Sequence, residues 1–445
     1  MPPAAPAVSP WMDEPCEAAP SLSGSLETDV AVIGAGYTGL STALALRAEG
    51  LRVAVLEREV AGFGASGRNA GHLTPTIGKD PPTLLRAFGR ERARALVALA
   101  EDAVRHVERN IERFAIDCDY VPAGNVLAAV HPRQHARLER AAEASAALGA
   151  KVRFLPPEDM RKRGLPAAFT CGVLEECGGT LHPARYLRGL RRAALDAGVA
   201  LHEQTPVLGL DAGRVARLRT PEGEVRAERV VLAANAFTPE LGWLRSRVTR
   251  LSVSLFESAP LSPEQRDAVD WRGREGIYTA HELLESYRLT ARGTVVGGSK
   301  RVRYAFGGRA VPDAHPPTFA LLESTFRERF PELADVAVER FWSGPIACTL
   351  DFLPVLGRTG KHGNVLYGAG YSGHGIALAS YAGPLLADLA LERDGPARAL
   401  TRGLRLPMPP EPVRWLVVHA LTGLFALLDN RVDRAARAAR AGRTR

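Results

Sequence analysis

The sequence predicts an α/β protein in which a doubly wound domain of parallel strands is interrupted by a second, α+β domain. Three observations lead to this prediction. An apolar strand, a glycine-rich turn and a helix follow one another within residues 29–49. A second apolar strand at 53–56 ends in an acidic residue. The alternation of helix and strand returns at residues 183–235 and at 341–391, after stretches with a different pattern.

The first turn has the spacing of a dinucleotide-binding motif. Residues 34–39 read GAGYTG, which fits G-x-G-x-x-G. Gly34 permits the tight turn, Gly36 lets the backbone approach a pyrophosphate, and Gly39 lets the helix lie close to the strand. The alternative is a tight turn that binds no ligand. The strand before it and the helix after it make that alternative much weaker.

The residues on either side of the turn fit the same interpretation. The helix is expected from about Thr38 to Glu49, so the N–H groups at Tyr37 and Thr38 and the positive end of the helix dipole face the phosphates. Glu57 lies 18 residues after Gly39, where an acid can bind a ribose hydroxyl, and Arg58 follows it.

A second Gly/Ser loop, GFGASGRNAGH at residues 62–72, follows the second strand. This loop favours FAD over a nicotinamide dinucleotide. The predicted domain is therefore an FAD-binding, Rossmann-like domain of the glutathione-reductase type.

Composition excludes several other classes of protein. The 445 residues are enough for two or three domains, and the net charge of +8 comes with no recognisable nucleic-acid-binding motif. The five cysteines form neither C-x-x-C nor a zinc spacing, so we expect free thiols in a reduced compartment and no metal. Residues 1–20 lack the features of a secretory signal, which predicts a cytoplasmic protein.

The chain divides into discontinuous parts. Residues 82–114 and 135–148 are expected to be helical, and 243–331 to be rich in strands. The predicted boundaries are a loosely draped N-terminal arm at 1–27, an FAD-binding domain at 28–81, 155–238 and 340–395, a substrate domain at 82–154 and 239–339, and a C-terminal helix with a basic tail at 410–445.

The C-terminal segment leaves two alternatives open. The apolar run 415–428 has 14 residues, fewer than the roughly 20 that a spanning helix needs, and arginines follow it at roughly helical spacing. It either docks on the protein itself, which we prefer, or lies in an anionic membrane surface at the inner face of the membrane.

Four motifs in this order resemble the FAD-dependent amine and amino-acid oxidases, the D-amino-acid oxidase-like family. They are GFGASGRNAGH at 62–72, GGTLHPARYLRGL at 178–190, VVLAANAF at 230–237 and LYGAGYSGHGIALA at 366–379. The likeness covers nearly the whole chain and is greatest to the γ-glutamylputrescine oxidase branch. The loop reads Asn69-Ala70-Gly71 where that branch often has two glycines, so the substrate is an analogy only.

The resemblance implies a set of FAD-binding residues. The pyrophosphate and ribose would be held by the first motif, the flavin by the second loop and the last glycine-rich segment, and the adenine by residues near the middle of the chain. The set is Gly34, Gly36, Tyr37, Thr38, Gly39, Glu57, Arg58, Ser66, Gly67, Arg68, Asn69, Gly71, His72, Val207, Asn235, Ala236, Gly344, Gly370, Ser372, Gly373, His374 and Gly375.

Two pairs of residues are candidates for catalysis or substrate binding. His72 and His374 would lie near the flavin and could tune it or help to activate oxygen as cations; a structural histidine is equally common. Tyr287 and Arg288 could bind a substrate carboxylate, although an Arg paired within the sheet is at least as frequent.

Tyr371 and Trp342 could form an aromatic wall for an alkyl amine, or could be ordinary packing. In some members of the family a cysteine upstream of a Thr–Asp segment tethers FAD. Cys348 directly precedes Thr349, with Asp351 two residues further on, so this register differs and we expect non-covalent FAD.

The predicted function is oxidation of the C–N bond of a small-molecule amine, γ-glutamylputrescine or a related compound, by hydride transfer to FAD. Hydrolysis of the imine gives an aldehyde, and O₂ is reduced to hydrogen peroxide. The alternatives are a glycine/sarcosine-type amino-acid oxidase, a membrane-associated dehydrogenase with another electron acceptor, and a flavin-bearing partner without turnover. No nucleic-acid partner is expected.

Overall fold

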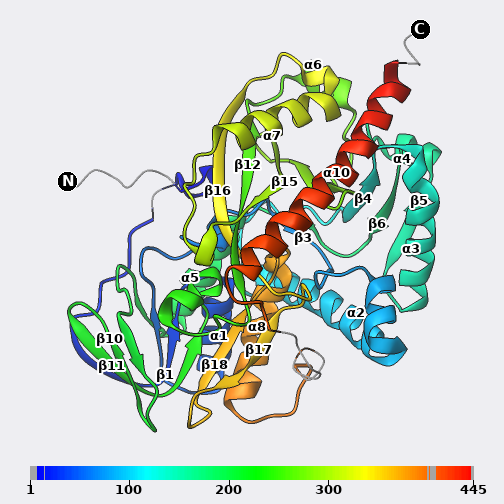
Figure 1. The fold of residues 1–445 in the computed structure, drawn as a ribbon. Coiled ribbons are helices and arrows are strands. Elements are labelled where there is room, and N and C mark those ends of the chain that lie inside the picture. The colour runs from blue at the N-terminus through cyan, green and yellow to red at the C-terminus, as the bar shows by residue number, and fades with distance from the viewer. Residues whose placement is uncertain (1–7, 15, 398–399, 401–406, 442–445) are drawn as a thin grey trace.

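The computed structural model describes residues 8–14, 16–397, 400 and 407–441 (Figure 1). Within these residues the chain forms two eight-stranded sheets, a two-stranded sheet of β3 (His72–Leu73) and β7 (Gly179–Thr180), and the helices that cover them. The predicted α/β class is confirmed.

The first sheet has the strand order β17-β18-β11-β1-β2-β8, with β10 and β9 continuing from β11. Strand β1 pairs in parallel with both β11 and β2, and the ends of these strands at Ile33, Leu56 and Leu232 are aligned. The strands are β1 (Gly24–Ile33), β2 (Val53–Leu56), β8 (Ala200–His202), β9 (Gly209–Asp211), β10 (Ala216–Arg219), β11 (Gly223–Leu232), β17 (Val355–Thr359) and β18 (Val365–Ala369).

Four helices form the main core with this sheet. Helix α1 packs against α8 and α5, and α2 packs against α8. Their bounds are α1 (Tyr37–Ala48), α2 (Pro81–Arg113), α5 (Pro183–Asp196) and α8 (Gly375–Ala390), which agree with the helical segments expected from the sequence. Gly89, at φ 75°, breaks α2 into two straight parts.

The second sheet has the order β16-β12-β15-β14-β13-β4-β6-β5. Helix α7 packs on β12 and β15, and α3 packs on β5 and β6. The strands are β4 (Asn125–Ala129), β5 (Val152–Leu155), β6 (Cys171–Glu175), β12 (Thr249–Ser258), β13 (Gly276–Thr279), β14 (Glu285–Leu289), β15 (Val295–Arg303) and β16 (Val338–Cys348); the helices are α3 (His135–Ala147), α4 (Pro157–Arg163), α6 (Pro263–Val269) and α7 (Pro316–Arg329).

Two strands lie in a different sheet from the one that the predicted boundaries imply. β6 and β16 fall within the segments assigned to FAD binding, yet both belong to the second sheet. β6 pairs with β4 and β5, and β16 pairs with β12. A short apolar strand does not reveal its partner in its own sequence, so the sequence could not place these two strands in their sheet. The division into domains stays a prediction.

The N-terminal segment is not loosely draped where the structure describes it. Trp11 is buried, and its Nε1 donates to the carbonyl of Asn69 at 2.8 Å. Ser9 donates to the carbonyl of Gly67 at 2.5 Å. The segment therefore holds the second glycine loop through two hydrogen bonds. Its Pro/Ala composition did not indicate this role. Residues 1–7 lie outside the described part.

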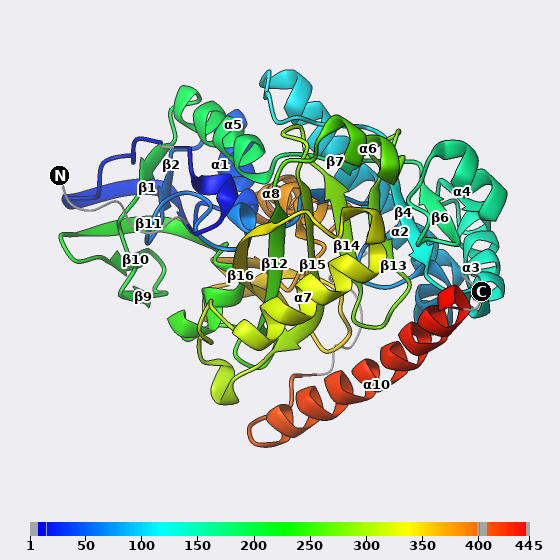
Figure 2. The ribbon, with the colours of Figure 1, turned by 90° about the horizontal axis from the view of Figure 1, so that it is seen from above.

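The C-terminal helix α10 (Val413–Ala441) is about twice as long as the apolar run and lies along the outside of the second sheet (Figure 2). Its Asp429 accepts from the backbone N–H groups of Glu282 and Leu283 at 2.8 and 2.9 Å. Asp433 binds Lys300 at 2.7 Å and Arg329 at 2.6 Å. The second half of the helix is thus docked through buried ionic contacts.

His281, Glu285 and Asp433 lie close enough together to suggest a metal site. Lys300 Nζ, however, is 2.7 Å from both carboxylates, and Arg329 contacts both as well. The positive charge that a metal ion would supply is therefore already provided by the protein.

Among the described helices, none is long and apolar enough to cross a membrane.

Candidate functional site

A cavity of about 1400 Å³ extends from the glycine turn of the first sheet to the face of the second sheet. This volume is larger than the roughly 300–1,000 Å³ typical of a pocket for one small ligand. Its lining includes the turn after β1, the end of β2, the second glycine loop, and residues of β6, β13, β14 and β16. It can therefore hold a dinucleotide together with a second, smaller molecule.

The glycine turn has the shape that the motif predicts. Gly34 has φ 106°, and a Cβ there would lie 2.9 Å from the carbonyl oxygen of Ala233. A Cβ on Gly36 would lie 2.9 Å from Ser66 Oγ, and one on Gly39 only 1.8 Å from the carbonyl oxygen of Gly34. The glycines therefore permit close packing of the turn against Ala233, Ser66 and the start of the helix, and Gly34 and Gly36 border the cavity.

Glu57 closes the ribose end of this turn. Its Oε2 accepts from the backbone N–H of Ala35 at 2.8 Å, and its Oε1 accepts from Glu59 at 3.1 Å. Burial raises the pKa of Glu57, and these two hydrogen bonds oppose that effect. Arg58 stacks over Phe237, with its Cζ 4.7 Å from the ring centroid, and both residues line the cavity.

The second glycine loop is tied to the first. Ser66 Oγ accepts from the backbone N–H of Tyr37 at 3.1 Å. Asn69 donates to the carbonyl of Ser66 at 3.0 Å and accepts from the N–H of Gly71 at 2.9 Å. Arg68 is buried and donates to the carbonyl of Ser343 at 3.1 Å, which joins the loop to β16. These bonds fix the loop across the cavity wall.

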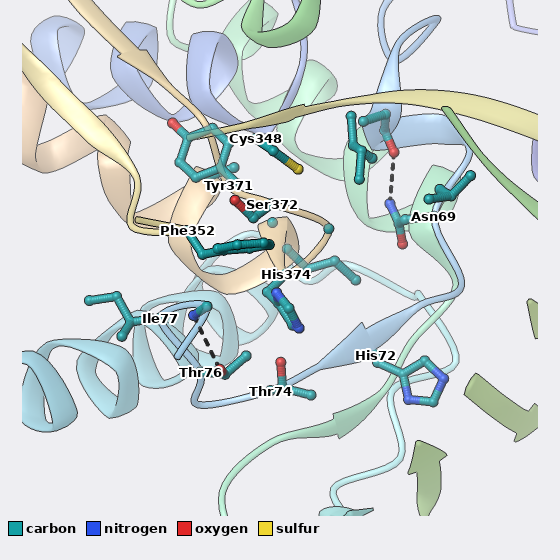
Figure 3. A pocket seen from close by; sticks show the side chains of 18 of the residues that line it. Asn69, His72, Thr74, Thr76, Ile77, Cys348, Phe352, Tyr371, Ser372 and His374 are labelled. Carbon is teal, nitrogen blue, oxygen red and sulfur yellow. Dashed lines mark hydrogen bonds between the residues drawn. The ribbon is translucent and has the colours of Figure 1, made fainter. Parts of the chain in front are cut away.

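The last glycine-rich segment reaches the same cavity. His374 precedes Gly375, the first residue of α8, so free N–H groups of that helix border the cavity. Figure 3 shows His374 between Phe352 and Thr74, with His72 farther along the segment that carries Thr74. At the adenine end, Asn235 accepts from the N–H of Gly370 at 3.1 Å. Val207 and Ala236 line the cavity nearby.

Most of the predicted FAD-binding residues line this one cavity. Three glycines lie behind it instead: Gly39, Gly67 and Gly370 are not part of the lining and serve the close packing of the turns. The residues that line it are Gly34, Gly36, Tyr37, Thr38, Glu57, Arg58, Ser66, Arg68, Asn69, Gly71, His72, Val207, Asn235, Ala236, Gly344, Ser372, Gly373, His374 and Gly375.

His72 has a defined tautomer. Asn125 Nδ2 donates to the carbonyls of Leu73 at 2.8 Å and Gly179 at 3.3 Å, so Asn125 Oδ1 is the acceptor that faces His72. His72 Nδ1 is 3.1 Å from that oxygen and therefore carries the proton. Nε2 is left as an acceptor, buried and without a partner among the described residues.

The protein interior affects the protonation of both candidate histidines. Burial lowers the pKa of His72 to about 4 and also lowers the pKa of His374. Nδ1 of His374 is buried without a partner among the described residues. Burial favours the neutral form of both rings, because a charged imidazole loses its hydration there. A role as a cation beside the flavin stays a prediction for both residues.

Arg288 lies behind the cavity wall. A Cβ on Gly71 would be 2.9 Å from the Cζ of Arg288, and the guanidinium lies 5.0 Å from the ring centroid of Trp11. Burial lowers the pKa of Arg288 to about 10, so it remains charged. Since Gly71 and Trp11 cover it, it does not line the cavity.

Tyr287 and Trp342 also lie outside the cavity. The Tyr287 hydroxyl donates to Glu285 at 3.0 Å, and its ring packs in the core beneath α7. Trp342 donates to the carbonyl of Arg68 at 2.9 Å. Tyr371 does line the cavity, and its hydroxyl is 2.8 Å from Thr38 Oγ1. Which of these aromatic side chains line the cavity depends on tertiary packing, which the sequence alone did not show.

The sequence missed several lining residues. Glu175 and Tyr278 on the second sheet, and Phe352 beside His374, are the most distinctive. Glu175 ends a short apolar strand. An acidic residue at the end of such a strand could have been considered as a candidate site residue. Nothing in the sequence indicated that this strand faces the glycine loop.

Cys348, at the end of β16, lines the cavity as well. Burial raises the pKa of its thiol to about 12, so it is neutral and a weak nucleophile. That state agrees with the expectation of non-covalent FAD, which stays a prediction.

Comparison with known proteins agrees with this geometry. The chain is 32% identical over 407 residues to gamma-glutamylputrescine oxidoreductase of Escherichia coli, which covers 88% of this chain and 89% of the relative. It is 26% identical over 373 residues to glycine oxidase of Pseudomonas aeruginosa, covering 82% and 95%. The glycine oxidase structure from Geobacillus kaustophilus has the same fold, with a TM-score of 0.72, 22% identity and coverage of 85% and 100%.

Residues 29–389 match the family described as FAD dependent oxidoreductases. The dinucleotide cradle, the cavity beside it and these matches together show that the chain belongs to this family of flavoenzymes, and that FAD is its cofactor.

Proposed function

We propose that this protein oxidises the C–N bond of an amine of the γ-glutamylputrescine kind and passes the electrons to O₂. The observation that carries the choice of an amine over an amino acid is the place of Arg288. The residue expected to bind a substrate carboxylate is covered by Gly71 and Trp11 and does not line the cavity. The named relative at 32% identity supports the same choice.

FAD, when bound, accepts a hydride from the carbon next to the substrate nitrogen. The residues of this chain prepare that step. The N–H groups at the start of α8 favour negative charge beside Gly375. Phe352 and Tyr371 make the wall apolar and exclude water. His72 Nε2 is a fixed acceptor that can hold an N–H of the substrate. The substrate nitrogen must be neutral when the hydride leaves.

An anaerobic screen tests the proposal. The FAD-loaded protein is mixed under argon with γ-glutamylputrescine, putrescine, sarcosine, glycine and D-amino acids, and the flavin absorbance is followed. We expect bleaching by γ-glutamylputrescine or putrescine and recovery of the colour with release of hydrogen peroxide on admitting air. Bleaching by glycine or sarcosine alone would favour the amino-acid oxidase, and bleaching without recovery in air would favour a dehydrogenase.

One observation favours the membrane-associated dehydrogenase as a second candidate. The first half of α10 exposes Leu416, Leu424 and Leu427 by 56, 51 and 62%, and exposed Arg431 and Arg434 continue that face. Sedimentation with phosphatidylserine-containing vesicles tests this candidate. Binding that depends on the anionic lipid, and that the substitution Leu427→Glu weakens, would support it; equal behaviour with and without vesicles would contradict it.

A further inference from the structure

Glu175 is a half-buried carboxyl group that the chemistry described so far does not use. It ends β6 and borders the cavity, but its Oε2 is shielded from solvent and has no hydrogen-bond partner among the described residues. Among those residues, no Lys or Arg forms a salt bridge with it, whereas its neighbour Glu176 pairs with Arg153. The charged form of a carboxyl group is costly in such a place, and a bound cation would offset that cost.

The strands place Glu175 close to His72. Gly276 of β13, Asn125 of β4 and Glu175 of β6 stand in one row, because Gly276 pairs with Asn125 and Asn125 pairs with Glu175. The β4–β6 pair is antiparallel, so the Cα atoms of Asn125 and Glu175 are roughly 4.5–5.5 Å apart and their side chains are on the same face. The β13–β4 pair is parallel. A Cβ on Gly276 would lie 2.5 Å from His72 Nδ1, so the imidazole covers this row.

Tyr278 lies two residues after Gly276 on β13, so its side chain is on the same face of the sheet. Its hydroxyl lies beside the Glu175 carboxylate, and both residues line the cavity. Burial raises the pKa of Glu175 to about 7, an effect that the Tyr278 hydroxyl only partly opposes. The wall therefore gathers two acceptors, the Glu175 carboxylate and His72 Nε2, on neighbouring parts of one surface.

We propose that Glu175 binds the ammonium group of the incoming substrate, before that nitrogen loses its proton for hydride transfer, with Tyr278 and His72 beside it on the cavity wall. The proposal rests on the proposed function in that the cation is taken to be the substrate's own amine. It extends that function because it names the residue that selects a cation. Amines are largely protonated at neutral pH, so a carboxylate here distinguishes them from alcohols of the same length.

Equilibrium binding to the reduced holoenzyme tests the proposal. FAD reduced by dithionite under argon cannot oxidise the probe, so calorimetry reports binding alone. The probes are n-butylammonium chloride and 1-butanol, which have the same chain length and differ in charge. We expect the wild type to prefer n-butylammonium, and Glu175→Gln to bind it at least tenfold more weakly with little change for 1-butanol.

Two variants provide the controls. Glu176→Gln removes the charge of the adjacent, exposed residue and should bind as the wild type does. Glu175→Asp keeps the charge and should retain most of the affinity. Equal affinity of the wild type and Glu175→Gln for n-butylammonium would overturn the proposal. So would a wild type without preference for n-butylammonium over 1-butanol, and this second result does not depend on any variant.

The outcomes separate this proposal from the proposed function. If an amine bleaches the flavin but Glu175→Gln binds n-butylammonium normally, amine oxidation stands and the role of Glu175 fails. If no amine bleaches the flavin but the cation binds in a Glu175-dependent manner, the cation site stands and amine oxidation fails.

Discussion

Asn125 determines which nitrogen of His72 faces outward. Its amide group satisfies the carbonyls of Leu73 and Gly179 and accepts from His72 Nδ1, so three polar groups depend on one side chain. All of them are in the interior, where an unpaired donor or acceptor costs about 1–3 kcal/mol. Asn125 does not line the cavity, yet through this hydrogen bond it leaves Nε2 of His72 as an acceptor.

Asn125→Ala should lower the free energy of unfolding and also reduce turnover of the amine. The expected loss of stability is about 2 kcal/mol, because the two carbonyls lose their donor and His72 loses its acceptor. Denaturant unfolding measures the first effect and steady-state kinetics the second. Asn430→Ala, on the exposed face of α10, is the control. An unchanged kcat/KM in Asn125→Ala would show that the orientation of His72 does not matter for turnover.

Gly39→Ala should weaken FAD binding by at least about tenfold. The new Cβ would lie 1.8 Å from the carbonyl oxygen of Gly34, so the turn must move, and shifts of this kind in a packed core cost about 1–3 kcal/mol. Quenching of free FAD fluorescence during titration of the apoprotein measures the affinity. Gly423→Ala, on α10 with nothing within 4 Å of the added Cβ, should bind FAD as the wild type does. Wild-type affinity in Gly39→Ala would contradict the role assigned to the close packing of this turn.

At the scale of elements, α10 is held by a buried ionic cluster rather than by its apolar run. Although burial alone would raise the pKa of Glu285, the charges of Arg329 and Lys300 lower it to about 2. Burial also opposes the shift at Asp433, yet His281, Arg329 and Lys300 lower its pKa. The apolar run suggested a docking helix, and the structure shows that charged residues beyond it provide the anchors.

This cluster predicts a loss of stability in acid. A carboxylate with a lower pKa in the folded than in the unfolded chain stabilises the fold above its unfolded value of about 4.3, and the contribution of Glu285 is lost as the pH falls from there toward about 2. Thermal unfolding between pH 7 and pH 2 measures this effect. Glu285→Gln should be less stable already at pH 7 and should lose less on acidification.

The control for that series is Glu339→Gln, an exposed residue of β16. It should follow the wild type throughout. If the wild type and Glu285→Gln lost stability in parallel as the pH falls, the cluster would not be the origin of the acid sensitivity.

Some helices and strands could be predicted from the sequence, and others could not. The glycine turn, α1, β2 and α8 were predictable because each carries its own local signal of spacing, apolar pattern and glycine position. The second sheet was not, because β13 lies between β14 and the distant β4, and β4 pairs with β6. The first pairing joins Gly276 to Asn125, 151 positions apart, and the second joins Asn125 to Glu175, 50 positions apart. No local pattern in the sequence records either contact. Glu175 and Tyr278 were missed for the same reason.

At the scale of the whole molecule, FAD binding should stabilise the protein substantially. The glycine turn, the second glycine loop and the start of α8 border one cavity, so a dinucleotide bound there would join segments that are distant in the sequence. A ligand present at 100 times its dissociation constant stabilises the native state by about 2.7 kcal/mol. We therefore expect the apoprotein to unfold at a lower temperature and FAD at that excess to restore the midpoint. The same concentration of riboflavin, which lacks the pyrophosphate and adenosine, is the control; an equal effect of riboflavin would contradict the assigned pyrophosphate turn.

The hydrogen bonds of Asp429 affect the order in which parts of the protein reach their final structure during synthesis. It fixes Glu282 and Leu283, which line the cavity, although 147 positions separate Asp429 from Glu282. The ribosome makes this stretch of wall long before the two backbone groups meet their anchor. The first glycine turn also depends on later residues, because Ala233 packs against Gly34 and α8 packs against α1. The cavity wall at Glu282 and Leu283 reaches its final form only after Asp429 has been made.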